Sequence, residues 1–117
     1  MGKVLFLLIL VGLLASFAFW SRSSFGDPET LKLLVKDGAK LLDVRTEGEF
    51  ASGHLDGAIN IPVSDLGLRL AELGDPATPI VVYCRSGARS ARAQTLLQSR
   101  GFASVHNLGG IGRWPKE

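Results

Sequence analysis

Residues 79–90 of this 117-residue chain read PIVVYCRSGARS. The apolar run at 79–83 is typical of a buried strand, and the residues after it lead into a helix-like stretch that ends near Arg100. Cys84, the only cysteine, therefore lies where a strand ends and a helix is about to begin. A thiol in that place faces the free N–H groups and the positive end of the helix, and both favour its thiolate form. We interpret Cys84 as a nucleophile.

Short helices and strands alternate on both sides of this stretch. We expect a helix that begins at 27–29 and ends at 37–38, a strand at 40–44, a single-turn helix at 46–51, a strand closed by Pro62, an amphipathic helix capped by Ser64 that runs through Leu66, Leu68, Leu70 and Leu73, and a last strand at 103–107. Such alternation predicts an α/β domain with a small, mostly parallel sheet and helices on both faces. In such sheets ligands bind beyond the carboxyl ends of the strands, and Cys84 lies at one of these ends.

The N-terminal residues differ in composition from the rest. Residues 4–20 are uncharged and would span roughly 25 Å as a hydrophobic helix. Two interpretations stay open: a membrane anchor with Trp20 and Arg22 at the interface, or a signal peptide cleaved near Ala18. Either predicts a protein of the cell envelope, membrane-anchored or exported to the periplasm. The expected division is a leader at 1–22, a linker at 23–26 and one domain at 27–117.

Charge is unevenly distributed along the domain. Residues 27–75 contain ten acidic and five basic side chains, whereas residues 76–116 contain six basic and no acidic ones. The cationic half holds Cys84, which predicts an anionic substrate. The domain as a whole is neutral, so we expect no nucleic-acid partner. A single cysteine excludes an intrachain disulfide, a CxxC pair and a multi-cysteine metal site, and no residue set indicates a cofactor.

The loop after Cys84 has the character of an anion cradle. Its backbone N–H groups could turn inward, and Gly87 would permit the close approach. Phosphoryl transfer, sulfane-sulfur transfer and thiol-based reduction of an oxyanion all fit such a cradle. Cysteine-dependent phosphatases carry an arginine six positions after the cysteine, but here that position is Ser90 and Arg89 comes one residue early. A reductase that recycles its own thiol needs a second cysteine. Sulfur transfer fits best.

Three segments of the chain together resemble the rhodanese family of sulfurtransferases. They are CRSGARS at 84–90, LLDVRTEGEF at 41–50 with GHLDGAINIP at 53–62, and LGG at 108–110 followed by Trp114. The resemblance extends over about residues 27–115 in one copy. It implies a rhodanese-like fold and covalent catalysis, in which the Cys84 thiolate takes sulfur from thiosulfate or a similar donor and forms a persulfide. Cyanide, a thiol or a partner protein would then accept the outer sulfur.

The resemblance also implies roles for residues around Cys84. The backbone at 85–90 would cradle the persulfide, while Arg85 and Arg89 would attract the donor and the departing sulfite. We expect Asp43 and Arg45 to pair with each other, with Glu49 or with loop N–H groups, and we keep Arg45 as a candidate substrate contact. The candidate site residues are Cys84 as nucleophile and, for substrate binding, Arg45, Arg85, Ser86, Gly87, Ala88, Arg89 and Ser90.

Two residues and two alternative functions complete the sequence-based description. We expect His54 to bond to backbone in a loop and Trp114 to serve packing. One alternative function is a persulfide carrier or protein-interaction module with little turnover of small donors. The other is a cysteine phosphatase or an arsenate reductase.

Overall fold

The structure is a computed structural model that describes residues 25–116. The hydrophobic helix and the leader expected at residues 1–22 lie outside these residues. Within 25–116, no helix is both long and apolar enough to cross a bilayer. The elements follow in the order α2 (Pro28–Lys36), β1 (Lys40–Asp43), α3 (Glu47–Ala51), β2 (Ile59–Asn60), η1 (Leu66–Leu68), η2 (Leu70–Leu73), β3 (Ile80–Cys84), α4 (Ala88–Ser99), β4 (Val105–Gly110) and η3 (Ile111–Arg113).

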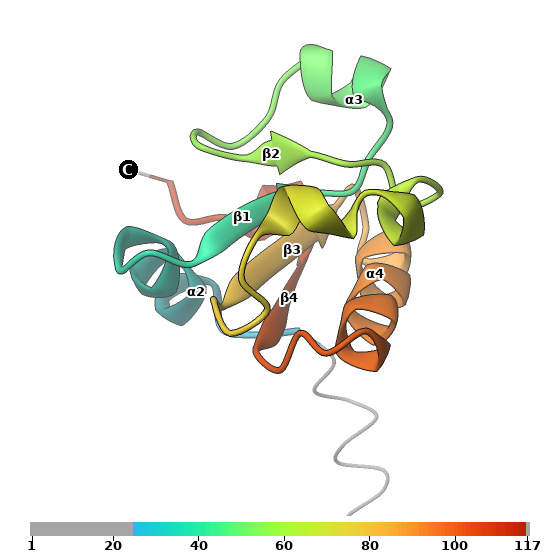
Figure 1. Cartoon of the computed structure of the whole chain (residues 1–117). Helices are drawn as coiled ribbons and strands as arrows, with labels where there is room; N and C mark the ends of the chain where they lie inside the picture. Colours follow the sequence, from blue (N-terminus) through green and yellow to red (C-terminus); the bar gives the residue numbers. More distant parts are fainter. Residues whose placement is uncertain (1–24, 117) are drawn as a thin grey trace, which may run out of the picture.

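The strands form one sheet in the order β2-β1-β3-β4, and every pair is parallel. Figure 1 shows α2 on one side of this sheet and α4 on the other. All five residues of β3 are buried, because a central parallel strand covered by helices is apolar on both faces. The predicted parallel α/β architecture with helices on both faces is confirmed.

Alternate side chains of β3 enter two separate cores. Val82 and Cys84 lie in the core on the α4 side, together with Ala93 and Leu97 of that helix. Val81 and Tyr83 lie in the core on the α2 side, and the residues that pack there with them are Leu31, Leu41, Leu108 and Trp114. The thiol therefore lies on the α4 face of the sheet, and the predicted packing role of Trp114 is confirmed.

Two helices begin where the sequence predicts, because their capping side chains are local. Asp27 accepts a hydrogen bond from the Thr30 amide at 3.0 Å and caps α2, with Pro28 as its first residue. Thr46 and Glu49 form a reciprocal capping box at the start of α3. α3 contains no buried residue, so contacts made by individual side chains hold it against the domain.

The prediction of an amphipathic helix from Ser64 through Leu73 is wrong. The segment forms two separate 3-10 turns, η1 and η2, and no side chain caps either one. Leu66 and Leu73 are fully buried, but Leu68 is 93% exposed. Gly67 lowers the helix propensity of so short a segment, and tight i→i+3 turns can bury the outer leucines without an α-helix.

The last strand runs further than the predicted 103–107. β4 continues to Gly110, with an irregularity opposite Val82 and Tyr83 that brings Gly110 level with Cys84. Gly109 has φ +91°, a left-handed conformation that glycine adopts at little cost. The LGG segment, expected to follow the strand, is thus its end and lies beside the nucleophile.

Candidate active site

Cys84 is the last residue of β3, and its side chain is almost completely buried. The backbone N–H of Gly87 donates a hydrogen bond to Cys84 Sγ at 2.9 Å. The Ser90 hydroxyl lies 3.4 Å from the same sulfur and 3.0 Å from the Gly87 carbonyl, to which it donates. The sulfur is therefore surrounded by polar groups of its own loop and of the first turn of α4.

These contacts determine how easily the thiol ionises. Burial raises the pKa of Cys84, but hydrogen bonds from Ser90, Gly87 and Ser86 outweigh burial and leave the pKa below its ordinary value. The N-terminus of α4 adds its positive end to the same region. The favourable causes are thus hydrogen bonds at short range, from the loop and from the first turn of α4.

The backbone of the loop has the conformation that a cradle requires. Gly87 is the N-cap residue of α4 and has φ +110°, a left-handed value that points its N–H at the sulfur. Gly87 and Ser90 are buried, whereas Arg85, Ser86 and Ala88 are exposed. The two buried residues and the Ser86 backbone thus contact Cys84, and the side chains of the three exposed residues form the outer surface of the loop.

The two arginines of the loop region have different surroundings. Arg89 forms a bidentate ion pair with Glu49 of α3, at 2.6 and 3.0 Å. Hydrogen bonding to Arg89, assisted by the Thr46 amide, lowers the pKa of Glu49 to about 2. Arg85 is exposed and forms no ion pair within residues 25–116. Arg85 is therefore the arginine of the loop whose positive charge is open to an arriving anion.

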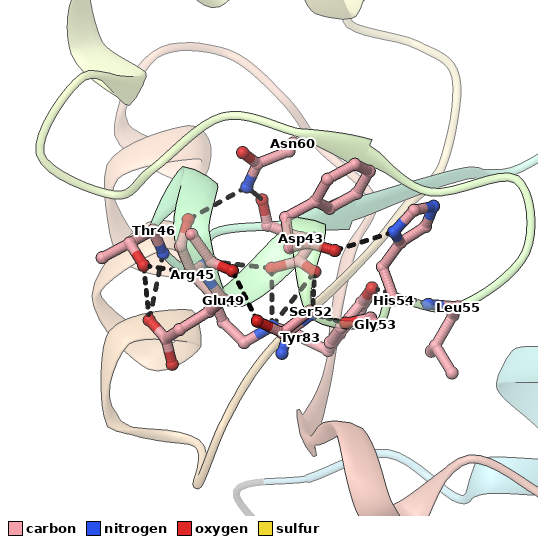
Figure 2. A network of polar contacts seen from close by, with 12 residues as sticks. Asp43, Arg45, Thr46, Glu49, Ser52, Gly53, His54, Leu55, Asn60 and Tyr83 are labelled. Carbon is pink, nitrogen blue, oxygen red and sulfur yellow. Dashed lines mark hydrogen bonds and ion pairs between the residues drawn. The ribbon is translucent and has the colours of Figure 1, made fainter.

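Arg45 belongs to a buried polar network beneath α3, drawn in Figure 2. Its guanidinium contacts the Asp43 carboxylate at 2.7–3.1 Å and donates to the Gly53 carbonyl at 2.7 Å. It also lies 5.7 Å from the centre of the Tyr83 ring. The predicted pairing of Asp43 with Arg45 is confirmed, and contact between Arg45 and substrate stays a prediction.

The same network fixes the loop that follows α3. The Tyr83 hydroxyl accepts a hydrogen bond from the Leu55 amide at 3.1 Å, and Asn60 donates to the carbonyls of Asp43 and Arg45 (Figure 2). His54 contacts the Phe50 carbonyl at 2.9 Å through Nδ1 and stacks on the Phe50 ring. The predicted backbone bond of His54 is thus confirmed. Within residues 25–116, no group of histidine, cysteine and acidic side chains could hold a metal ion.

Three contacts at the site were not predicted from the sequence. A Cβ atom on Gly110 would lie 2.6 Å from the Arg85 carbonyl oxygen, so the end of β4 packs directly on the loop. The Phe25 ring lies against Gly87, although residues 23–26 were expected to be a linker. Glu49 was considered a partner for Asp43 or Arg45 but pairs with Arg89. The paired glycines at 109–110 could have indicated the close packing of Gly110 on the loop. No local sequence pattern indicates the contacts of Phe25 with Gly87 or of Glu49 with Arg89.

Comparison with known proteins gives a consistent result. Residues 27–117 match the sequence profile of the rhodanese-like domain. Thiosulfate sulfurtransferase 18 of Arabidopsis thaliana is 37% identical, over 72% of this chain and 71% of its own length. Thiosulfate sulfurtransferase PspE of Escherichia coli is 35% identical, over 60% of this chain and 68% of its own length.

A solved structure shows the same architecture. The human single-domain sulfurtransferase TSTD1 superimposes with a TM-score of 0.64 at 33% sequence identity. The superposition covers 72% of this chain and 86% of the human protein. The likeness in fold thus extends over most of the described domain.

Proposed function

Since the chain belongs to the rhodanese-like sulfurtransferase family, we propose that it moves sulfane sulfur from an anionic donor such as thiosulfate to a thiophilic acceptor through Cys84. The main support is the position of the Cys84 sulfur at the end of the central strand, where it accepts a hydrogen bond from the Gly87 amide of its own loop. Such a sulfur is a nucleophile whose charge is already stabilised before substrate arrives.

The reaction consists of two displacements on sulfur. In the first, the Cys84 thiolate attacks the outer sulfur of thiosulfate, the sulfur–sulfur bond of the donor breaks, and its electron pair leaves with sulfite. The product is a Cys84 persulfide. In the second, cyanide, a thiol or a partner protein attacks the outer sulfur, and the Cys84 thiolate returns with its electron pair. Sulfur is transferred and no external oxidant or reductant is needed.

The loop contributes charge stabilisation at both steps. Its N–H groups already donate to Sγ, and N–H groups that surround a persulfide would stabilise the negative charge on its outer sulfur. We assign attraction of the donor to Arg85, because its charge is exposed. In this structure Arg89 and Arg45 are each held by a carboxylate, so a donor would have to share or displace that partner in order to contact them.

The geometry disfavours the phosphatase alternative. Ser90 stands six positions after Cys84, where those enzymes need an arginine, and its hydroxyl is bonded inward to Gly87. A persulfide carrier would use the same Cys84 chemistry but exchange sulfur only with proteins. The rates of loading by a protein donor and by thiosulfate distinguish it from an enzyme that turns over small donors.

The test is release of thiocyanate from thiosulfate and cyanide by the purified full chain. We expect saturable release that depends on both substrates and is abolished in Cys84→Ser. Loading by a protein donor far faster than by thiosulfate would favour the carrier. Hydrolysis of an aryl phosphate or reduction of arsenate without thiocyanate release would overturn the proposal.

We further propose that residues 4–20 attach or export the protein at the cell envelope. The uncharged run with Trp20 and Arg22 behind it supports this assignment. The intact mass of protein extracted from membranes tests it: the full mass supports an anchor, and a mass that begins after Ala18 supports an exported form. Recovery of the full-length chain entirely outside the membrane fraction would contradict both.

A further inference from the structure

Phe25 precedes the family domain at residues 27–117 and yet lies on the reactive loop. A Cβ atom on Gly87 would collide with its Cζ atom, and its Cγ atom is 3.1 Å from the place that a Cβ on Gly109 would occupy. The ring thus spans from the end of β4 to the loop and fills the space beside both glycines. It remains 39% exposed, a high value for a phenylalanine packed on an active site.

Contacts with β4 and η3 hold Phe25 in this position. The Gly26 amide next to it donates to the Asn107 carbonyl at 2.8 Å. The Arg113 guanidinium carbon lies 5.1 Å from the centre of the Phe25 ring, and the same guanidinium donates to the Leu108 carbonyl. A cation over an aromatic face is attractive, so Arg113 holds the ring against the two glycines.

The contact with Gly87 matters because of what Gly87 does. Its N–H donates to Cys84 Sγ, and the direction of that N–H depends on the φ of +110°. Glycine has a broad choice of backbone conformations, so an unsupported Gly87 could rotate its amide away from the sulfur. A ring packed on its α-carbon restricts that rotation.

We propose that Phe25, held by Arg113, is a positioning residue that keeps the Gly87 amide on the Cys84 sulfur. Its effect reaches the sulfur through Gly87. The proposal rests on the proposed function only in taking Cys84 as the nucleophile, and it can be tested on the thiol alone.

Other charged groups near the loop must stay constant in the test. They are Arg85 in the loop, Arg89 of α4 with its partner Glu49 of α3, and Arg113 of η3, which contacts Phe25. Substitutions at Phe25 remove none of these charges. A change in the ionisation of Cys84 would therefore report the position of the Gly87 amide.

The experiment measures the rate of Cys84 alkylation by iodoacetamide, a neutral reagent, against pH in the full chain. In Phe25→Ala we expect the thiol pKa to rise by about 0.5–1 unit, so that alkylation below the pKa slows by about three- to tenfold. Phe25→Leu keeps an apolar contact and should shift the pKa by less. The control Leu33→Ala removes an apolar side chain that is 64% exposed on α2 and should behave as wild type.

Circular dichroism and thermal melting identify any variant that fails to fold, and Phe25→Leu then carries the comparison. Superimposable pH curves for wild type, folded Phe25 variants and Leu33→Ala would overturn the proposal. Thiocyanate release by the wild type is scored separately. Its absence would overturn the sulfurtransferase function while leaving a shifted alkylation curve as support for Phe25.

Discussion

Cys84 is activated by residues of its own loop and of the first turn of α4, and among them Ser90 forms two hydrogen bonds. Its hydroxyl carries a single proton, which it donates to the Gly87 carbonyl while the Cys84 thiol can donate to the Ser90 oxygen. When the thiol loses its proton, the hydroxyl can rotate and donate to the thiolate. Ser90 thus has a hydrogen-bonding partner in both states, and the thiolate gains more from it because hydrogen bonds to charged groups are stronger.

Ser90→Ala should therefore raise the pKa of Cys84. The variant keeps the Gly87 amide but loses the hydroxyl, and we expect a rise of about one unit. A raised pKa lowers the thiolate fraction at neutral pH, so both alkylation and sulfur uptake should slow there and recover at higher pH. The pH profile of alkylation measures this.

Ser99→Ala is the matched control, because Ser99 lies near the opposite end of α4 and bonds the Leu96 carbonyl. Equal pKa values in the two serine variants would contradict the role given to Ser90.

At the scale of elements, α3 depends on single contacts for its position. It has no buried residue, and the bidentate pair between Glu49 and Arg89 connects it to α4 across 40 residues of sequence. The pKa of Glu49 is lowered from 4.5 to about 2. A carboxylate with a lowered pKa contributes its stabilisation above its unfolded pKa and loses it as the pH falls through the folded value. The contact should thus be complete above about pH 4.5 and weaken as the pH falls toward about 2.

Glu49→Gln should loosen α3 at neutral pH. Glutamine can still serve in the capping box with Thr46 but carries no charge for Arg89. We expect amide hydrogen exchange at residues 47–52 to accelerate by about two- to fivefold.

Glu47→Gln changes the same charge on the same helix at a residue that has no ion pair within residues 25–116, so its exchange should stay near wild type. If the two variants exchange alike, the ion pair does not hold α3.

The burial of the leucines in η1 predicts how their substitution changes the free energy of unfolding. Leu66 is fully buried and Leu68 is 93% exposed, although both belong to one short turn. Leu66→Ala should lower the free energy of unfolding by about 2–5 kcal/mol, whereas Leu68→Ala should change it by less than about 0.5 kcal/mol. Urea denaturation measures both values. Similar losses in the two variants would contradict the placement of Leu66 in the core and Leu68 on the surface.

The elements show which features a sequence reveals and which require the fold. The strand at β3 and the starts of α2 and α3 depend on residues within a few positions of one another, and all three were predicted. The contacts of Arg89 with Glu49 and of Gly87 with Phe25 join distant segments, so no local pattern specifies them. The prediction of a helix after Ser64 was wrong for a different reason. Most of its leucines have helical spacing, but core packing decides the conformation of so short a segment more than periodicity does.

Across the whole molecule, folding brings an acidic side chain of the first half of the domain against a basic side chain of the second half. Residues 76–116 contain only basic charges, but the acidic half supplies Glu49 to Arg89. Arg85 thus remains the exposed cation of the nucleophile loop. Donor capture should depend on its field and weaken as salt screens it.

Arg85→Gln should lower kcat/KM for thiosulfate by about three- to tenfold at low ionic strength and reduce its dependence on salt. The control Arg100→Gln removes an exposed charge at the C-terminal end of α4, far from the loop along the helix, and should have little effect. Steady-state kinetics at several salt concentrations provide the measurement. Equal losses in the two variants would assign the effect to overall charge.

The proposed reaction requires that sulfur from the donor becomes bound to Cys84. The most direct test is the mass of the Cys84 peptide after the full chain has been incubated with thiosulfate and separated from it without reductant. We expect that peptide to gain about 32 Da and to lose this mass after cyanide is added. An unchanged mass at Cys84, in protein that releases thiocyanate no faster than Cys84→Ser, would contradict it.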